Sequence, residues 1–495
     1  MSAHASASGR KAEPAASPEA PHSLGLFDAT MLVVGAMIGS GIFIVTADIA
    51  RQMNSPGWLL LVWLVTGILT VFGALSFGEL AAAMPRAGGT YVFLREGLGP
   101  LAGFLYGWTL FVVIQTGTIA AVAAAFARFL GVIFPAVSPD VFLSLGRIPM
   151  PGGEIELGVS PQRIVAIIVV AILTAVNIRG LREAKWVQNI FTVAKTGALI
   201  GLIVLGVAVG WASEATAVNF RDMFTGAPSG MALVLAFGAA MVGSLFSSDS
   251  WHNVTFAAAE VRRPERNLPL ALGLGAGTVT VLYLLANIAY LMVLPLPEIQ
   301  NAPEDRVGTL ALQRILGEPG LYVMAVAILV STFGCLNGLI LAGARVYYAM
   351  ARDGLFFRIA GVLSPRTQVP AWALFLQGVW AVLLTLTGTY GQLLDYVIFA
   401  ALLFYALTIV ALFALRVRRP DLPRPYRAFG YPVVPAVYML SAAAVAGILL
   451  FAKPVYTFSG LFLVLLGVPV YFLWRARAGE RVAAAEAAPS GVPEG

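Results

Sequence analysis

Three consecutive small residues, Gly39, Ser40 and Gly41, interrupt an apolar run that extends from about Ala29 to Ala50. All three residues favour leaving an α-helix. A helix broken at membrane depth is tolerated only where the freed backbone lines a cavity or is buried in protein. The freed N–H groups would then bind an anionic group, as helix N-termini do. The alternative interpretation is a stripe of small residues at which helices pack.

Four consecutive polar residues, Ser247 to Ser250, interrupt a second apolar run at 229–258. A carboxylate at membrane depth costs on the order of 3 kcal/mol, so Asp249 should have a partner. An unwound segment here would offer free carbonyls, and the Asp249 carboxylate, to a substrate ammonium. The other interpretation is that Asp249 or Ser250 caps a half-helix that begins near Trp251. The two are compatible, because a cap is needed only where the helix is broken.

Lys195 lies about a third of the way into a further apolar run, 188–211. This depth is too great for easy snorkelling, so the ammonium must find an acceptor or water. The alternative is that the side chain reaches the cytoplasmic headgroups. Weaker candidates for a pocket or gate are Thr116, Trp251 and Tyr405, which could equally bond or pack within the helices. His252 is expected to be a packing residue, with a proton-handling role as the alternative. Glu79 and Glu260 are expected to anchor basic loops.

The chain that must position these residues is far too apolar for a soluble protein. Of its 495 residues, 59% are hydrophobic and 11% charged, whereas soluble domains carry about 25% charged residues. About twelve apolar runs could span the bilayer. They are 28–50, 57–82, 98–134, 162–178, 188–211, 229–258, 268–294, 318–350, 371–388, 392–416, 431–451 and 456–475. The sequence therefore predicts an all-α polytopic membrane protein.

Arginine and lysine gather in the N-terminal segment and in the loops on its side of the membrane. The positive-inside rule therefore places both termini in the cytoplasm. Residues 1–23 are rich in Ala, Ser and Pro and are expected to form a disordered cytoplasmic tail. Residues 24–476 would form the transmembrane domain, and 477–495 a cytoplasmic C-terminal tail.

The first and sixth apolar runs contain similar segments: the sequence of Gly35 to Phe43 is similar to that of Gly238 to Phe246. Five spans separate the two segments, so they would cross the membrane in opposite directions. Inverted repeats with matching broken helices point to the site of a secondary transporter.

The sequence lacks the motifs typical of several other classes of function. The sequence contains no phosphate-binding G-x-x-x-x-G-K-[ST] loop and no H-E-x-x-H motif. Its single cysteine, Cys335, allows no internal disulfide. We therefore expect no enzyme, cofactor, metal site or nucleic-acid partner, and the sequence leaves the oligomeric state open.

Six segments carry a family likeness over nearly the whole chain, from about Leu24 to Arg475. They are Gly35–Phe43, Gly78–Tyr91, Gln188–Lys195, Glu260–Pro269, Phe333–Gly338 and Arg419–Arg427. With them the chain resembles the amino acid–polyamine–organocation superfamily. Within it, the chain is most similar to bacterial members of the L-amino-acid transporter family, relatives of the light chains of heteromeric exchangers.

The resemblance implies a LeuT-like fold with two inverted repeats of five helices, 28–211 and 229–416. Two extra helices would follow within 431–475. Helices one and six would be unwound at mid-membrane.

The resemblance also implies a substrate site at these two breaks. Ser40 and Gly41 would bind the substrate carboxylate, and the carbonyls of Met37 and Phe246 its ammonium. Phe246 would also act as a gate. Ile38, Gly39, Ser247, Asp249 and Ser250 complete the expected site. Lys195, near Ser331, would replace a sodium ion, which implies sodium-independent transport.

Two departures from the family pattern refine these expectations. The loop 134–163 has no cysteine, so no disulfide-linked heavy chain is expected. Ser250 stands where many relatives have glycine, which would narrow the pocket. We therefore expect exchange of small to medium neutral amino acids across a bacterial inner membrane. The alternatives are a proton-coupled amino-acid or polyamine permease and, in another class, a membrane sensor that binds an amino acid without transport.

Overall fold

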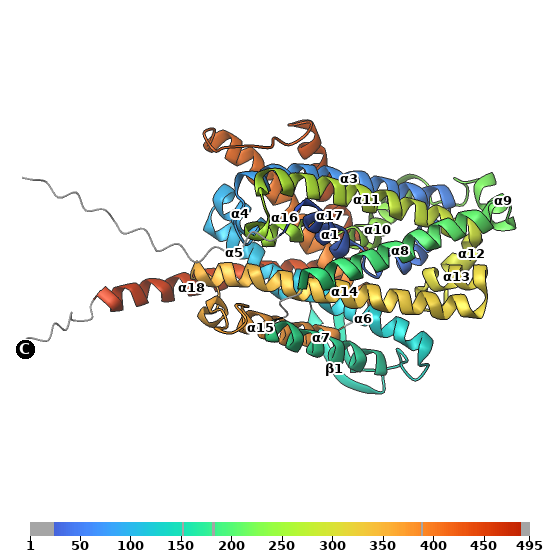
Figure 1. Ribbon diagram of the computed structural model, residues 1–495, viewed down its shortest axis with the longest axis horizontal. Coiled ribbons are helices and arrows are strands. Elements are labelled where there is room, and N and C mark those ends of the chain that lie inside the picture. Colours follow the sequence, from blue (N-terminus) through green and yellow to red (C-terminus); the bar gives the residue numbers. More distant parts are fainter. Residues whose placement is uncertain (1–23, 151–152, 181–183, 388–389, 487–495) are drawn as a thin grey trace, which may run out of the picture.

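The computed structural model describes residues 24–150, 153–180, 184–387 and 390–486 (Figure 1). The described chain is nearly all helical, and the long helices run side by side in one bundle. Ten of its helices are long and apolar enough to span a membrane. The predicted class, an all-α polytopic membrane protein, is thereby confirmed. The expected N-terminal tail, residues 1–23, lies outside the described residues.

The first half of the chain begins with α1 and ends with α8. Its helices are α1 (Leu26–Met37), η1 (Gly41–Phe43), α2 (Thr46–Met53), α3 (Pro56–Ala83), α4 (Thr90–Leu98), α5 (Pro100–Thr109), the π-helical turn η2 (Leu110–Ile114), α6 (Gln115–Ile133), α7 (Pro161–Arg179) and α8 (Ala184–Gly210). Between α6 and α7, strands β1 (Leu143–Met150) and β2 (Gly153–Val159) form an antiparallel hairpin that the sequence analysis did not predict.

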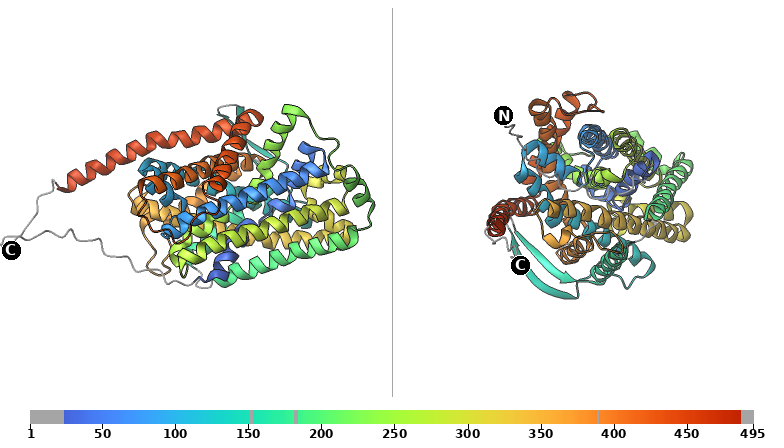
Figure 2. Two further views of the ribbon diagram at one scale, coloured as in Figure 1. Left: turned by 90° about the horizontal axis from the view of Figure 1, so that it is seen from above. Right: turned by 60° about the vertical axis from the view of Figure 1, so that its left-hand side comes forward.

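The second half of the chain begins with α9 and ends with α16. Its helices are α9 (Glu214–Arg221), α10 (Gly230–Ser247), η3 (Trp251–Glu260), α11 (Pro264–Val293), α12 (Leu296–Gln300), η4 (Pro303–Asp305), α13 (Val307–Leu316), α14 (Glu318–Arg352), η5 (Arg358–Gly361), α15 (Ala371–Thr385) and α16 (Tyr390–Arg418). The final helices are α17 (Val433–Ala452) and α18 (Pro454–Glu486). Helix α18 extends well beyond the bundle (Figure 2).

Two of the expected spans differ from uninterrupted membrane helices. The run 28–50 is divided into α1, η1 and α2, none of which is long enough to cross a bilayer alone. The run 371–388 contains α15, which has 15 residues. The other ten expected runs each contain a helix of spanning length, whereas these two do not, because apolar length alone does not register where a helix breaks or stops.

The first and sixth spans cross the bundle in opposite directions. At the start of α1, the Leu24 N–H donates to the carbonyl of Glu260, at the end of η3, over 3.1 Å. At the end of α2, the Asn54 amide donates to the carbonyl of Gly226, just before α10, also over 3.1 Å. Because the beginning of one span meets the end of the other, the two are antiparallel, as an inverted repeat requires.

The second and seventh spans, α3 and α11, are related in the same way and pack along their length (Figure 2). Gly67 on α3 approaches Thr280, whereas Gly78, further along α3, approaches Pro269, which comes earlier in α11. Small residues at these positions let the two backbones come close, which is how membrane helices gain packing energy. Helices α6 and α14, and α7 and α15, also pack on each other.

A buried carboxylate joins the end of α3 to the segment after α16. The Glu79 side chain is 2% exposed and accepts hydrogen bonds from Arg416 over 2.9 Å and from the backbone N–H of Ala428 over 2.7 Å. Arg424 lies 3.3 Å from the same carboxylate. Arg345 on α14 donates to Glu260 over 2.8 Å. Glu79 therefore anchors a basic loop, as predicted, whereas the partner of Glu260 lies within α14 and not in a loop.

We expect Glu79→Gln to lower the stability of the bundle by about 1–3 kcal/mol, because it leaves two partly buried arginines without their counter-charge. The measurement is the midpoint of thermal unfolding of the detergent-solubilised protein. The matched control is Glu154→Gln in the hairpin. Its partner, Arg147, lies 3.5 Å away, and both side chains are more than half exposed. A midpoint as high in Glu79→Gln as in Glu154→Gln would contradict this role.

Candidate functional site

The first break lies between α1 and α2. Ile38 leaves the helical region with ψ 89°, and neither Gly39 nor Ser40 is helical before the short turn η1 begins. The N–H groups of Ser40 and Gly41 donate to no acceptor within the described part of the chain. Two adjacent free donors inside a helical bundle match the predicted anion-binding backbone.

The second break follows α10. Ser248 and Asp249 are not helical, and Ser250 has φ 67°, in the left-handed region that favours glycine. The helical turn η3 then begins at Trp251. Ser250 makes no side-chain cap on this turn. The predicted break is present, and the backbone at residue 250 explains why a glycine would suit this position.

The two breaks meet, and one tyrosine joins them. A Cβ added to Gly41 would lie only 2.9 Å from the backbone Cα of Ser247, so the segments are in close contact. The Tyr283 hydroxyl of α11 lies 2.8 Å from the Met37 carbonyl oxygen and 3.1 Å from that of Ser247. Nothing in the sequence marks Tyr283, which is an isolated tyrosine in an apolar helix.

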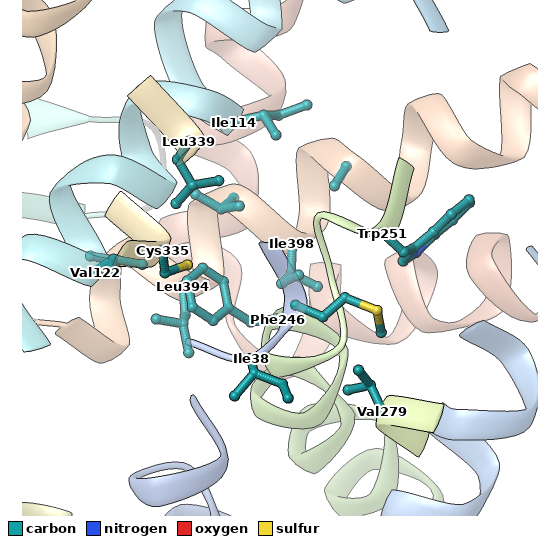
Figure 3. Packing of buried hydrophobic residues seen from close by; sticks show 14 of the residues in the cluster. Ile38, Ile114, Val122, Phe246, Trp251, Val279, Cys335, Leu339, Leu394 and Ile398 are labelled. Atoms are coloured by element: carbon teal, nitrogen blue, oxygen red, sulfur yellow. The ribbon is translucent and has the colours of Figure 1, made fainter. Parts of the chain in front are cut away.

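A small cavity of about 20 Å³ lies at this junction. It is lined by Ala36, Met37, Gly39, Ser40, Gly41, Thr118, Val122, Phe246, Ser247, Asp249, Ser250, Cys335 and Leu339. Eight of these were predicted site residues: Met37, Gly39, Ser40, Gly41, Phe246, Ser247, Asp249 and Ser250. In Figure 3, Val122, Cys335 and Leu394 lie together on one side of Phe246, and Trp251 lies on the other.

Four predicted site or pocket residues do not line the cavity: Ile38, Thr116, Trp251 and Tyr405. Thr116 instead donates to the Phe111 carbonyl over 2.6 Å, across the π-helical turn η2. Thr118 lines the cavity, although its hydroxyl likewise donates to its own helix, to the Ile114 carbonyl over 2.7 Å. Residues two apart on a helix point about 200° apart, so only one of the two threonines faces the cavity. Among the lining residues, Val122, Cys335 and Leu339 carry no sequence signal that separates them from ordinary packing residues.

Trp251 and Tyr405 lie behind Asp249. The Tyr405 hydroxyl donates to the Asp249 carboxylate and is 3.2 Å from Nδ1 of His252. The His252 ring packs against Trp251 and Phe256, as expected of a packing histidine. No basic side chain forms an ion pair with Asp249 within the described residues. The carboxylate is therefore held by a hydroxyl and has no counter-charge of its own.

An aromatic pair lies beside the cavity, at the start of α16. The rings of Phe246 and Tyr390 meet edge to face, with centroids 5.9 Å apart. The Ser40 hydroxyl donates to the Tyr390 oxygen over 3.3 Å, and the Arg128 guanidinium lies 5.5 Å from the centre of the Tyr390 ring. Phe246 thus has the position expected of a gate, and Tyr390 is its partner. The sequence analysis missed Tyr390, which comes just before its expected span.

The start of α1 is tied to its neighbours by hydrogen bonds. Leu24 is held between Glu260 and Arg262 by two backbone hydrogen bonds of 3.1 and 2.8 Å. Asp28, in the first turn of α1, accepts from Asn189 of α8 over 3.0 Å. These contacts fix the start of α1 against the end of η3 and against α8.

Lys195 and Ser331 hold the end of α1. Lys195 is 1% exposed, and its ammonium donates to the Gly35 carbonyl. The Ser331 hydroxyl lies 3.4 Å from the carbonyls of Ile38 and Gly39. A cation near the C-terminal end of a helix is favourable because the last carbonyls are partially negative. The alternative that Lys195 reaches the headgroups is wrong.

Similarity to known proteins decides the family. The sequence model of a family described as "Amino acid permease" matches residues 24–473. The chain belongs to the amino acid permease family. This permease is therefore a multi-pass membrane protein.

The relatives of this permease are transporters. It is 32% identical over 462 residues to the large neutral amino acids transporter small subunit 2 of Homo sapiens, which covers 91% of this chain and 80% of the relative. It is 30% identical over 455 residues to the b(0,+)-type amino acid transporter 1 of Rattus norvegicus, covering 91% and 87%. The resemblance to amino-acid transporters drawn from the sequence is confirmed.

Proposed function

We propose that this permease moves small to medium neutral L-amino acids across a bacterial inner membrane by sodium-independent exchange, with both termini in the cytoplasm. The observation that carries the proposal is the pair of opposed helix breaks around one cavity, with the free N–H groups of Ser40 and Gly41 on one of them. Such half-helix ends bind the charged groups of a substrate without requiring buried formal charges.

The backbone supplies donors and acceptors for both ends of a zwitterion. The substrate carboxylate accepts from the N–H groups of Ser40 and Gly41 and from the Ser40 hydroxyl. The ammonium donates to the carbonyls of Met37 and Phe246. The Met37 carbonyl already accepts from Tyr283, but a carbonyl oxygen has a second lone pair for the substrate.

Transport requires the cavity to open to one side at a time. Its volume of about 20 Å³ holds roughly one water molecule, so an amino acid enters only after the walls move. Parting Phe246 from Tyr390 opens one side, and releasing Leu24 and Asp28 from their partners opens the other. Because each closure is made by different residues, the two can alternate.

Two side chains support the proposed sodium independence and the preference for smaller substrates. Lys195 holds the end of α1 with a fixed charge, where the resemblance places a sodium ion, so no bound sodium is needed. Ser250 lines the cavity and adds a side chain where a glycine would leave space, which favours smaller substrates. The absence of cysteine from 134–163 supports function without a disulfide-linked partner.

The test is counterflow in proteoliposomes. Vesicles are loaded with unlabelled alanine, serine, leucine, arginine or glutamate, and uptake of labelled alanine is followed without sodium. We expect uptake that depends on internal neutral amino acid and is unchanged by sodium or a pH gradient. Binding of alanine without uptake would instead favour a sensor, and neither binding nor uptake would overturn the assignment.

A second candidate is a proton-coupled permease for amino acids or polyamines. It is favoured by Asp249, whose carboxylate lines the cavity with a hydroxyl as its partner and no ion pair within the described residues. Such a group could be neutralised by a proton or by a cationic substrate. A polyamine site would, however, be expected to hold more carboxylates than this one.

The variant Asp249→Asn separates the two candidates. Under exchange, counterflow should stay within about fivefold of wild type, because one buried hydrogen bond contributes about 1 kcal/mol. Under proton coupling, uptake into empty vesicles driven by an inward proton gradient should be lost. Tyr405→Phe is the matched control, since it removes the hydroxyl but keeps the carboxylate. Gradient-driven uptake in wild type that Asp249→Asn abolishes would replace exchange with proton coupling.

A further inference from the structure

A second and larger cavity, of about 530 Å³, lies next to the gate. Tyr390 lines it, as do the first turns of α16, the charged end of α2, and the connection between α17 and α18. Cavities of about 300–1,000 Å³ are typical of small-molecule sites. We call this second cavity the outer cavity and the one at the helix breaks the inner cavity. The outer cavity is large enough for a ligand in the same conformation in which the inner cavity has room for about one water molecule.

The charged residues of the outer cavity occur as two groups. Lys453 Nζ lies 2.7 Å from a carboxylate oxygen of Asp395. On another wall, Arg51 lies 2.7 Å from Asp305 and 3.7 Å from Asp48. Each group offers both a cation and a carboxylate to a molecule in the cavity.

A zwitterion fits this arrangement better than a simple ion. The carboxylate of an amino acid can accept from Lys453 while its ammonium donates to Asp395, so neither protein charge loses a counter-charge. A simple anion or cation entering between them would leave one of the two unpaired, which is costly in a partly buried site.

The Lys453–Asp395 pair is the more sheltered of the two groups. Its side chains are 26% and 9% exposed, against 41% and 34% for Arg51 and Asp305. Charges away from water are less screened and interact more strongly. Asp395 also lies on α16 only five residues after Tyr390, which puts a molecule bound there beside the gate.

We propose that the outer cavity binds a second amino-acid molecule as a zwitterion, with Lys453 and Asp395 as its main contacts, before the gate opens. This inference rests on the proposed transport of amino acids. The outer molecule is the one that enters the inner site when Phe246 and Tyr390 part.

The first test measures how many molecules bind. The full-length protein in lipid nanodiscs is titrated to saturation with tritiated L-alanine, and separately with tritiated L-leucine. Two molecules per chain are expected for wild type, and one for Lys453→Met, for Asp395→Asn, and for Gly41→Val, which fills the inner site. One molecule per chain in a wild type that transports, or two in both outer-cavity variants, would overturn the proposal.

The second test uses transport kinetics. Lys453→Met and Asp395→Asn should raise the half-saturating concentration of external alanine about tenfold and leave the plateau rate unchanged. Lys453→Arg, which keeps the charge, should stay near wild type. A lower plateau with unchanged half-saturation would indicate a merely structural role and refute the outer site. If wild type neither binds nor transports any amino acid, the proposed function itself fails.

Discussion

Replacing Gly41 with alanine is expected to reduce counterflow about a hundredfold. The added Cβ would lie 2.7 Å from the Cβ of Ser247 and 2.9 Å from its backbone Cα. A side-chain rotation cannot relieve a contact with backbone, so the two helix breaks must move apart. Overpacking of this kind costs up to about 3 kcal/mol, which equals about a hundredfold in rate. The measurement is the initial rate of alanine counterflow at equal protein incorporation.

The control for this prediction is Gly277→Ala, because nothing lies within 4 Å of a Cβ added there. Its counterflow should match wild type. The double variant Gly41→Ala/Ser247→Gly should keep a larger fraction of the Ser247→Gly rate than Gly41→Ala keeps of the wild-type rate. The reason is that Ser247→Gly removes the side-chain atoms nearest to the added Cβ. Wild-type counterflow in Gly41→Ala would show that the breaks do not meet as closely as in this structure.

Lys195→Met is expected to reduce counterflow about thirtyfold. The substitution keeps the length of the side chain but removes the charge that holds the Gly35 carbonyl at the end of α1. A cation in a favourable, partly buried place at a helix C-terminus contributes up to about 2 kcal/mol, and each 1.4 kcal/mol is a factor of ten. Counterflow with and without sodium is the measurement.

Sodium distinguishes the role of the charge from simple packing. Lys195→Ala leaves space near Ser331, so added sodium should restore part of its rate, whereas Lys195→Met should show no such recovery. Arg221→Gln, which removes an exposed cation elsewhere, is the control and should behave as wild type. Unchanged counterflow in Lys195→Met would contradict the proposal that this charge replaces a sodium ion.

The sequence alone predicted the positions of both helix breaks. Gly39, Ser40 and Gly41, and the polar residues from Ser247 to Ser250, weaken a helix through their own backbone preferences. These preferences act locally, so they are visible without knowing what packs nearby. The membrane class and most of the spans could be predicted for the same reason, since the apolar length of a segment is also a local property.

Tertiary structure decided what surrounds the breaks. Tyr283, Tyr390 and Cys335 come from three helices far apart in the chain, and each looks like an ordinary member of an apolar span. Which threonine of α6 faces the cavity depended on how the π-helical turn η2 sets the rotation of the helix. In a bundle whose helices are apolar on nearly every side, no periodic stripe marks the inward face. The residues that face the site are therefore selected by packing between distant segments, which local sequence does not encode.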